Sequence, residues 1–146
     1  MKFQEYILVT TSSPSETHKF GLSLAAHAEP GDIICLHGDL GAGKTAFVKG
    51  FAEGMGANPD KVNSPTFTLI HEYRDGKLPL FHFDAYRIKT TQEALEIGTE
   101  DYLYDEGVCL IEWPEKIASL IPSEAVHVFI EKVGPELRTF RVTHRK

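Results

Sequence analysis

One stretch of eight residues limits what this chain can fold into more than any other. It reads GDLGAGKT, from Gly38 to Thr45, and it matches the pattern G-x-x-x-x-G-K-[ST]. The apolar run Ile33–Leu36 precedes it, as expected for a strand that is buried on both faces. Large apolar residues then recur every fourth position over Lys44–Met55, which indicates an amphipathic helix. A strand, a glycine-rich loop and a helix in this order predict a phosphate-binding P-loop.

Each residue type in this loop has a physical reason to bind a nucleoside triphosphate. Glycines let the backbone curl so that N–H groups point at phosphate oxygens, and the helix adds the positive end of its dipole. Lys44 is expected to reach the β- and γ-phosphates, and the Thr45 hydroxyl to bind Mg²⁺. The chain has no Asn-Lys-x-Asp motif for reading guanine, which favours ATP over GTP. The predicted cofactor-binding residues are Asp39, Leu40, Gly41, Ala42, Gly43, Lys44, Thr45 and Ala46.

Two carboxylates follow apolar runs elsewhere in the chain. Asp84 ends the run LPLFHFD, and Glu112 ends the run VCLIE. A P-loop site needs acids beyond the loop itself, and these usually stand at the ends of buried strands. We therefore predict Lys44, Asp84 and Glu112 as catalytic residues, and Thr45, Asp84 and Glu112 as metal ligands. The pattern leaves open which carboxylate binds Mg²⁺ directly, and a lone acid at a strand end is otherwise a solvated residue or a helix cap.

The loop after the P-loop helix contains the segment NSPTF. In switch-type NTPases this position carries a hydroxyl that senses the γ-phosphate and Mg²⁺. Ser64, Pro65 and Thr66 therefore form a candidate switch-like loop. Turn formation around Pro65 is the alternative interpretation.

The segment HFDAYR, residues 82–87, and the single tryptophan add further candidates. Alternation along a strand would place the first, third and fifth residues of this segment on one face. Arg87 is a candidate for stabilising transferred charge, although a strand-end salt bridge is the simpler interpretation. Trp113 follows Glu112 and would either pack in the core or cover the site.

The remaining pattern predicts an α/β fold. Ser13 suits a helix N-cap, Pro14 the first helical position and Glu16 the last position of a capping box. Asp75 and Gly76 between two apolar runs indicate a hairpin. Buried strands together with hairpins predict a P-loop NTPase-like three-layer sandwich with a mixed central sheet, parallel plus an antiparallel hairpin. We expect one P-loop ATPase domain over residues 1–146, with strands over 5–11, 67–73, 78–86, 107–113, 125–133 and 137–145 and short helices over 90–98 and 114–120.

Composition narrows the function classes. The formal net charge is −6, whereas surfaces that bind nucleic acid directly are usually basic. Cys35 and Cys109 both lie in apolar runs, which favours buried thiols over a redox role. The sequence shows no signal peptide and no apolar run of the roughly 20 residues that a membrane span needs. We therefore expect a cytoplasmic protein.

Four segments together resemble one family. GDLGAGKT, NSPTFTL, HFDAYR and LIEWPE, in this order and spacing, are similar to the bacterial TsaE (YjeE) family, P-loop ATPases of tRNA threonylcarbamoyladenosine biosynthesis. The resemblance spans about Ser12 to Val133. Many families share the P-loop alone, whereas the set of four segments is specific.

The resemblance implies ATP and Mg²⁺ as cofactors and a threonylcarbamoyl-transferase heterodimer, of TsaB and TsaD type proteins, as the partner. That pair modifies the adenosine next to the anticodon in tRNAs that read A-starting codons. The family member would meet tRNA only through its partners, hydrolyse ATP slowly alone and faster with them, and reset the pair. By the same resemblance, Glu112 is the acidic residue for Mg²⁺ and water, and Asp84 is an essential acid near the metal. It also implies a partner-dependent site, for which Tyr86, Arg87 and Trp113 are the candidates.

Other functions remain open on the residues alone. A small-molecule kinase on the same scaffold would need an arginine-bearing lid that excludes water, and the five arginines do not cluster into one. A regulatory switch would bind the triphosphate tightly and hydrolyse it slowly. A static binding module would not need a metal-binding hydroxyl and two acids.

Overall fold

The computed structural model describes residues 7–39, 43–62 and 70–144. Seven strands form one sheet in the order β1-β7-β6-β2-β5-β4-β3. The strands are β1 (Ile7–Thr11), β2 (Ile33–His37), β3 (Ile70–Tyr73), β4 (Leu80–Asp84), β5 (Val108–Glu112), β6 (Val126–Lys132) and β7 (Arg138–His144). The helices are α1 (Pro14–Ala25), α2 (Lys44–Gly54), α3 (Thr91–Glu96) and α4 (Thr99–Leu103), with 3₁₀ helices η1 (Pro59–Lys61) and η2 (Pro114–Leu120).

The sheet is mixed, as the sequence predicts. Strands β6, β2, β5 and β4 are parallel neighbours in the centre. Strand β3 pairs antiparallel with β4 through the predicted hairpin, and β7 pairs antiparallel with both β6 and β1. The carboxyl ends of the parallel strands therefore meet at one edge of the sheet, where open α/β sheets bind their ligands.

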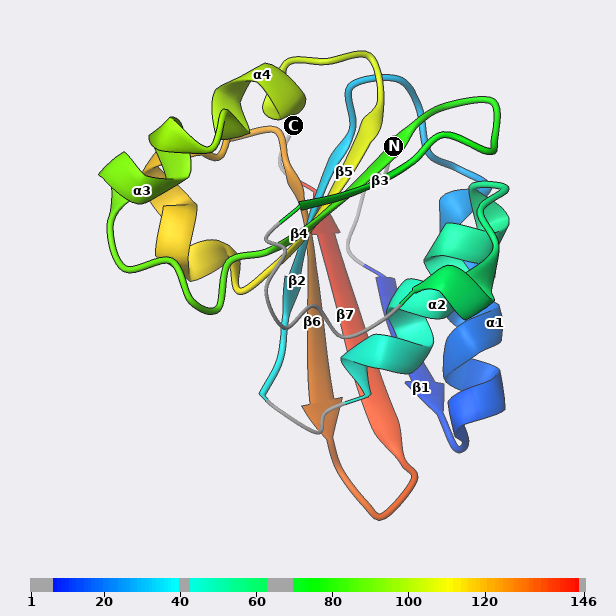
Figure 1. Cartoon of the computed structure of the whole chain (residues 1–146). Coiled ribbons are helices and arrows are strands. Elements are labelled where there is room, and N and C mark those ends of the chain that lie inside the picture. Colours follow the sequence, from blue (N-terminus) through cyan, green and yellow to red (C-terminus); the bar gives the residue numbers. More distant parts are fainter. Residues whose placement is uncertain (1–6, 40–42, 63–69, 145–146) are drawn as a thin grey trace.

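Helices cover both faces of the sheet, which confirms the predicted three layers. Helices α1 and α2 lie on one face, and α3, α4 and η2 lie on the other (Figure 1). Alternate residues of β2 divide between the two cores: Ile34 and Leu36 pack with α2, and Ile33 and Cys35 pack on the opposite face. None of the helices in the described ranges is long and apolar enough to cross a membrane.

Both cysteines are core residues, as predicted. Cys35 and Cys109 are buried and unpaired with each other. Burial raises the pKa of each thiol to about 12. A thiol that stays protonated at neutral pH is a poor nucleophile, so these residues act as small apolar core groups.

The start of α1 follows the predicted cap closely. The Ser13 side chain accepts a hydrogen bond of 3.1 Å from the Glu16 backbone N–H, and Pro14 takes the first helical position. The Glu16 carboxylate, however, accepts from the N–H of Ser12 at 2.8 Å rather than from that of Ser13. The capping box is therefore shifted by one residue, and the hydroxyl of Ser12 reinforces it.

Two elements were not predicted. Residues 59–61 form the 3₁₀ helix η1, in which Asn58 accepts from the Asp60 N–H at 2.9 Å. The helix that follows Thr90 ends as predicted at Gly98, but Gly98, with φ at 81°, also starts α4 at once. Gly98 therefore ends one helix and caps the next. A glycine after a helical pattern predicts only the end of that helix, so α4 was not predicted.

Helices α1 and α2 pack with their backbones in close contact at Gly50. A Cβ atom at Gly50 would overlap the carbonyl oxygen of His18 on α1. Alanine would add about 1 kcal/mol of helix propensity, but separating the two helices costs more. We expect Gly50→Ala to lower the free energy of unfolding by about 2 kcal/mol, measured by urea denaturation.

Lys49→Ala on the same helix is the matched control for this packing. The Lys49 side chain is only half-buried, so its removal should change the free energy of unfolding by less than about 0.5 kcal/mol. A Gly50→Ala variant as stable as the wild type would show that the two helices do not need this close approach.

Candidate functional site

The predicted site residues converge on the carboxyl ends of the central parallel strands. Strand β2 runs into the glycine-rich loop, and α2 begins at Lys44 (Figure 1). Asp84 is the last residue of β4 and Glu112 the last residue of β5, and the two are register partners. The same register places Leu36, near the end of β2, beside Glu112. The lysine and both acids thus come to one edge of the sheet, although they are far apart in the sequence.

Gly43 closes the loop in a conformation that favours glycine. Its φ is 95°, in the left-handed region, and it stands at the N-cap of α2. A Cβ atom there would lie 3.3 Å from Nε of Arg138 on β7. The backbone conformation therefore favours glycine, and the approach of Arg138 leaves little room for a side chain.

Lys44 is a buried ammonium at the start of α2. The side chain belongs to a residue that is 7% exposed, and Nζ has no hydrogen-bond partner in the part of the chain that the structure describes. Nζ lies 3.9 Å from the centre of the Trp113 ring, which gives it a cation–π contact. Burial lowers the pKa of Lys44, while the charges of Glu112, Asp84, Glu115 and Asp39 oppose that shift. A charge held in this way is ready to accept an anionic group.

The two carboxylates are each held by one hydrogen bond. Oε2 of Glu112 lies 2.7 Å from Nε2 of His82. Oδ1 of Asp84 accepts from the Tyr86 N–H at 3.0 Å, so Asp84 also closes the turn after β4. Burial raises the pKa of Asp84, the Tyr86 N–H opposes this, and the nearby charge of Glu112 raises it further. A cation near the two carboxylates would therefore stabilise their charged forms.

Trp113 leaves β5 in an unusual backbone conformation. Its φ is 57°, and it is the one residue other than glycine with a positive φ in the described ranges. This region costs a residue with a Cβ atom about 1–2 kcal/mol, and such strain is often found at functional sites. The turn brings the indole over Lys44 and within 5.0 Å, between ring centres, of Tyr86. Tyr86 is 47% exposed, so the two rings form an outer wall beside the lysine.

A comparison with known protein families assigns the family of this chain. A family model described as "Threonylcarbamoyl adenosine biosynthesis protein TsaE" matches residues 11–140. The chain belongs to the TsaE family. This confirms the resemblance drawn from the four sequence segments.

Individual TsaE proteins are similar in sequence to this chain over most of their length. The tRNA threonylcarbamoyladenosine biosynthesis protein TsaE of Bacillus subtilis is 47% identical over 133 residues, which are 91% of this chain and 82% of that protein. The protein of the same name from Treponema pallidum is 40% identical and covers 89% of this chain and 95% of its own. A crystal structure of Bacillus subtilis YdiB matches with a TM-score of 0.81 at 39% identity, over 99% of this chain and 88% of that one. The TsaE fold is therefore the fold of this chain.

Several predicted residues of the TsaE chain lie outside the described ranges. They are Leu40, Gly41 and Ala42 of the P-loop and Ser64, Pro65 and Thr66 of the switch-like loop. Their predicted roles stay predictions. Asp39 and Thr45 are exposed and Ala46 is half-buried around the start of α2, and Arg87 is exposed after β4.

His82 is a site residue of this TsaE chain to which the sequence pattern assigns no role. It is 2% exposed and bonds Glu112 directly. Its position two residues before Asp84 places it on the same face of β4, which the alternation of the strand does reveal. What the pattern could not reveal is its partner, because Glu112 lies 30 residues away on the neighbouring strand.

Proposed function

We propose that this TsaE family chain binds ATP with Mg²⁺ at the carboxyl ends of its parallel strands and hydrolyses it as a component of tRNA threonylcarbamoyladenosine modification. One observation supports this most. The Lys44 ammonium is buried at the N-terminus of α2, lacks a hydrogen-bond acceptor in the described ranges, and lies near two paired carboxylates. The phosphates of ATP would supply the missing acceptors, and the helix N-terminus favours their negative charge.

The residues at this edge fit a magnesium ion. Asp84 and Glu112 each use one oxygen in a hydrogen bond, which leaves the other for a ligand. No group of three or more His, Cys, Asp or Glu side chains in the described ranges could hold a metal alone. This agrees with a site in which Thr45, Asp84 and Glu112 share the ion with phosphate oxygens, as Mg²⁺ is usually bound. Bound Mg²⁺ would neutralise charge on the β- and γ-phosphates.

The chain's own residues would then divide the work of hydrolysis. Lys44 stabilises the charge on the β- and γ-phosphates, which is a contact that strengthens as the bond to the leaving group breaks. Glu112, held by His82, orients the attacking water. Asp84, fixed by the turn at Tyr86, supports the metal from the adjacent strand. The site thus needs positioning more than covalent chemistry.

We further propose that the transferase pair docks beside this site. Tyr86 and Trp113 form an aromatic wall next to Lys44, and Arg87 is exposed at the same turn. Closure of a partner over this wall would exclude water other than the attacking one and raise turnover. The net charge of −6 agrees with a chain that meets tRNA only through its partners, in the cytoplasm. Hydrolysis would then reset the pair for the next tRNA.

Reconstituted tRNA modification tests this proposal. The transferase pair, threonylcarbamoyl-adenylate and an unmodified tRNA that reads an A-starting codon are incubated with and without this chain and ATP. We expect repeated rounds of modification only when both are present. Equal yields of modified tRNA without the chain, or with ATP replaced by a non-hydrolysable analogue, would contradict the proposed role.

The single tryptophan provides a direct signal for nucleotide binding. Lys44 Nζ lies 3.9 Å from the ring centre, and an ammonium ion so close affects indole emission. Because bound phosphates should draw the ammonium away, we expect the fluorescence of Trp113 to change on adding ATP. The Trp113→Phe variant is the control and should show no change in the tryptophan emission band on adding ATP. An unchanged spectrum at a concentration where calorimetry detects ATP binding would contradict the expected movement of Lys44.

A further inference from the structure

His82 is an unusual residue for the middle of a buried strand. It is 2% exposed, and its register partners are Leu110 on β5 and His71 on β3. Leu80, two residues before it on the same face of β4, is also buried. Burying a polar ring costs free energy unless both nitrogens find partners. His82 Nε2 has one partner, Glu112, but its Nδ1 is buried without one in the described ranges.

The bond to Glu112 determines which ring nitrogen of His82 carries the hydrogen. An ionised carboxylate can only accept, so His82 Nε2 carries the hydrogen and donates it over 2.7 Å. Oε2 of Glu112 is then occupied from the buried side. The bond holds the carboxylate in one orientation and leaves its other oxygen for the site.

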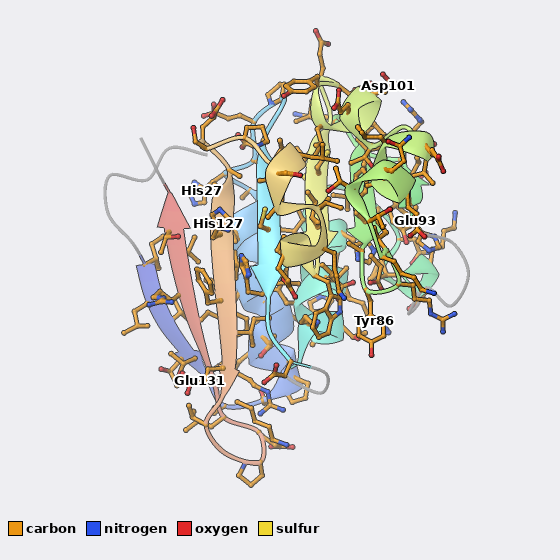
Figure 2. All side chains as sticks on the ribbon, turned by 90° about the vertical axis from the view of Figure 1, so that its left-hand side faces the viewer. His27, Tyr86, Glu93, Asp101, His127 and Glu131 are labelled. Carbon is orange, nitrogen blue, oxygen red and sulfur yellow. The ribbon has the colours of Figure 1, made fainter. Side chains whose placement is uncertain are left out.

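A purely structural role explains this arrangement poorly. The chain contains a comparison on the other face of the sheet, where His37 and His127 bond each other at 2.8 Å through Nε2 and Nδ1. Figure 2 shows His127 on that face of β6, away from α1 and α2. Neither of those imidazoles leaves a buried nitrogen without a partner in the described ranges. At His82 an apolar residue would avoid burying an Nδ1 that has no partner among the described residues, so the benefit of the imidazole lies in what it does to Glu112.

We propose that His82 is a positioning residue that aligns the Glu112 carboxylate for ATP hydrolysis. The proposal rests on the proposed function and adds a residue to it. A carboxylate at the end of a strand would otherwise rotate among several orientations. Partners that orient a catalytic or metal-binding group typically contribute about 10–100-fold to affinity or activity. His82 therefore acts through Glu112 and need not touch ATP.

Two variants separate positioning from folding. His82→Leu keeps the volume of the side chain and removes the donor. His82→Gln keeps an amide N–H at a similar reach from the backbone. ATP turnover is measured with the transferase pair, and the ATP dissociation constant is measured separately from Trp113 fluorescence. We expect His82→Leu to lower kcat by about 10–100-fold with an ATP dissociation constant within about twofold of wild type, and His82→Gln to recover part of kcat.

A double variant tests whether His82 acts through Glu112. In a Glu112→Ala background, His82→Leu should cause no further loss of kcat, because the group that it positions is already gone. His127→Leu is the matched control, since it also removes a hydrogen-bonded imidazole from the sheet but one on the opposite face. It should leave kcat within about twofold of wild type.

The outcomes distinguish this inference from the function on which it rests. If the wild-type chain does not hydrolyse ATP with the pair, the proposed function and the positioning role both fail. If the wild type is active, an unchanged kcat in His82→Leu overturns the positioning role alone. A parallel loss of ATP affinity and thermal stability, with no recovery in His82→Gln, overturns it also, because it would show a structural role. The positioning role is overturned as well if the losses of kcat from His82→Leu and Glu112→Ala add in the double variant, because His82 would then act independently of Glu112.

Discussion

Glu112→Ala is expected to slow ATP hydrolysis by at least about tenfold while the fold is retained. The carboxylate stands at the end of β5, and we assign it contacts that matter mainly in the transition state. Its loss should therefore lower kcat more than it raises KM. The measurement is steady-state turnover with the transferase pair, together with a melting curve that verifies folding.

Two comparisons sharpen this expectation. Glu106→Ala removes an exposed acid from the loop before β5 and should leave kcat unchanged. Asp84→Asn removes the charge of the neighbouring acid, and the relative losses decide which carboxylate has the larger role. Near-normal turnover in Glu112→Ala with a severe loss in Asp84→Asn would move the assigned role to Asp84.

Lys44→Ala is expected to weaken ATP binding by roughly 10- to 100-fold. A hydrogen bond to a charged group contributes about 1.5–3 kcal/mol, and about 1.4 kcal/mol corresponds to a factor of ten in affinity. Part of this is offset in the wild type, because Lys44 must leave its contact with Trp113, which is worth about 0.5–2 kcal/mol. The dissociation constant is measured by calorimetry, since the variant also alters the fluorescence of the free protein.

Lys49→Ala is the matched control for this charge. It removes a lysine from the same helix at a position five residues further along. Its dissociation constant for ATP should equal that of the wild type. Equal affinity in Lys44→Ala would contradict the assignment of this ammonium to the phosphates.

Local signals predicted most of the fold. The Ser13 cap, the proline after it and the turn at Asp75-Gly76 are each determined by neighbouring residues, and the structure confirms a helix and a hairpin there. The mixed sheet followed from the contrast between fully apolar runs and hairpins. The helix α4 was missed because Gly98 serves as both stop and cap, and a local pattern reveals only the first use.

The candidate site was predictable to the extent that it depends on strand ends. Asp84 and Glu112 end buried parallel strands, and register brings them together. The bond from His82 to Glu112 was not predictable, because it depends on which strands are neighbours. The contact of Lys44 with Trp113 depends on the positive φ of the tryptophan. That backbone conformation cannot be predicted from the residue type.

We propose that this TsaE family chain is an ATPase whose activity depends on its partners. The most direct test is ATP turnover by the purified chain, alone and with the matching TsaB and TsaD type pair. We expect slow turnover alone, strong stimulation by the pair, and loss of the stimulated rate in Glu112→Ala. Turnover that is equally slow with and without the pair would contradict the account and favour a nucleotide-dependent switch.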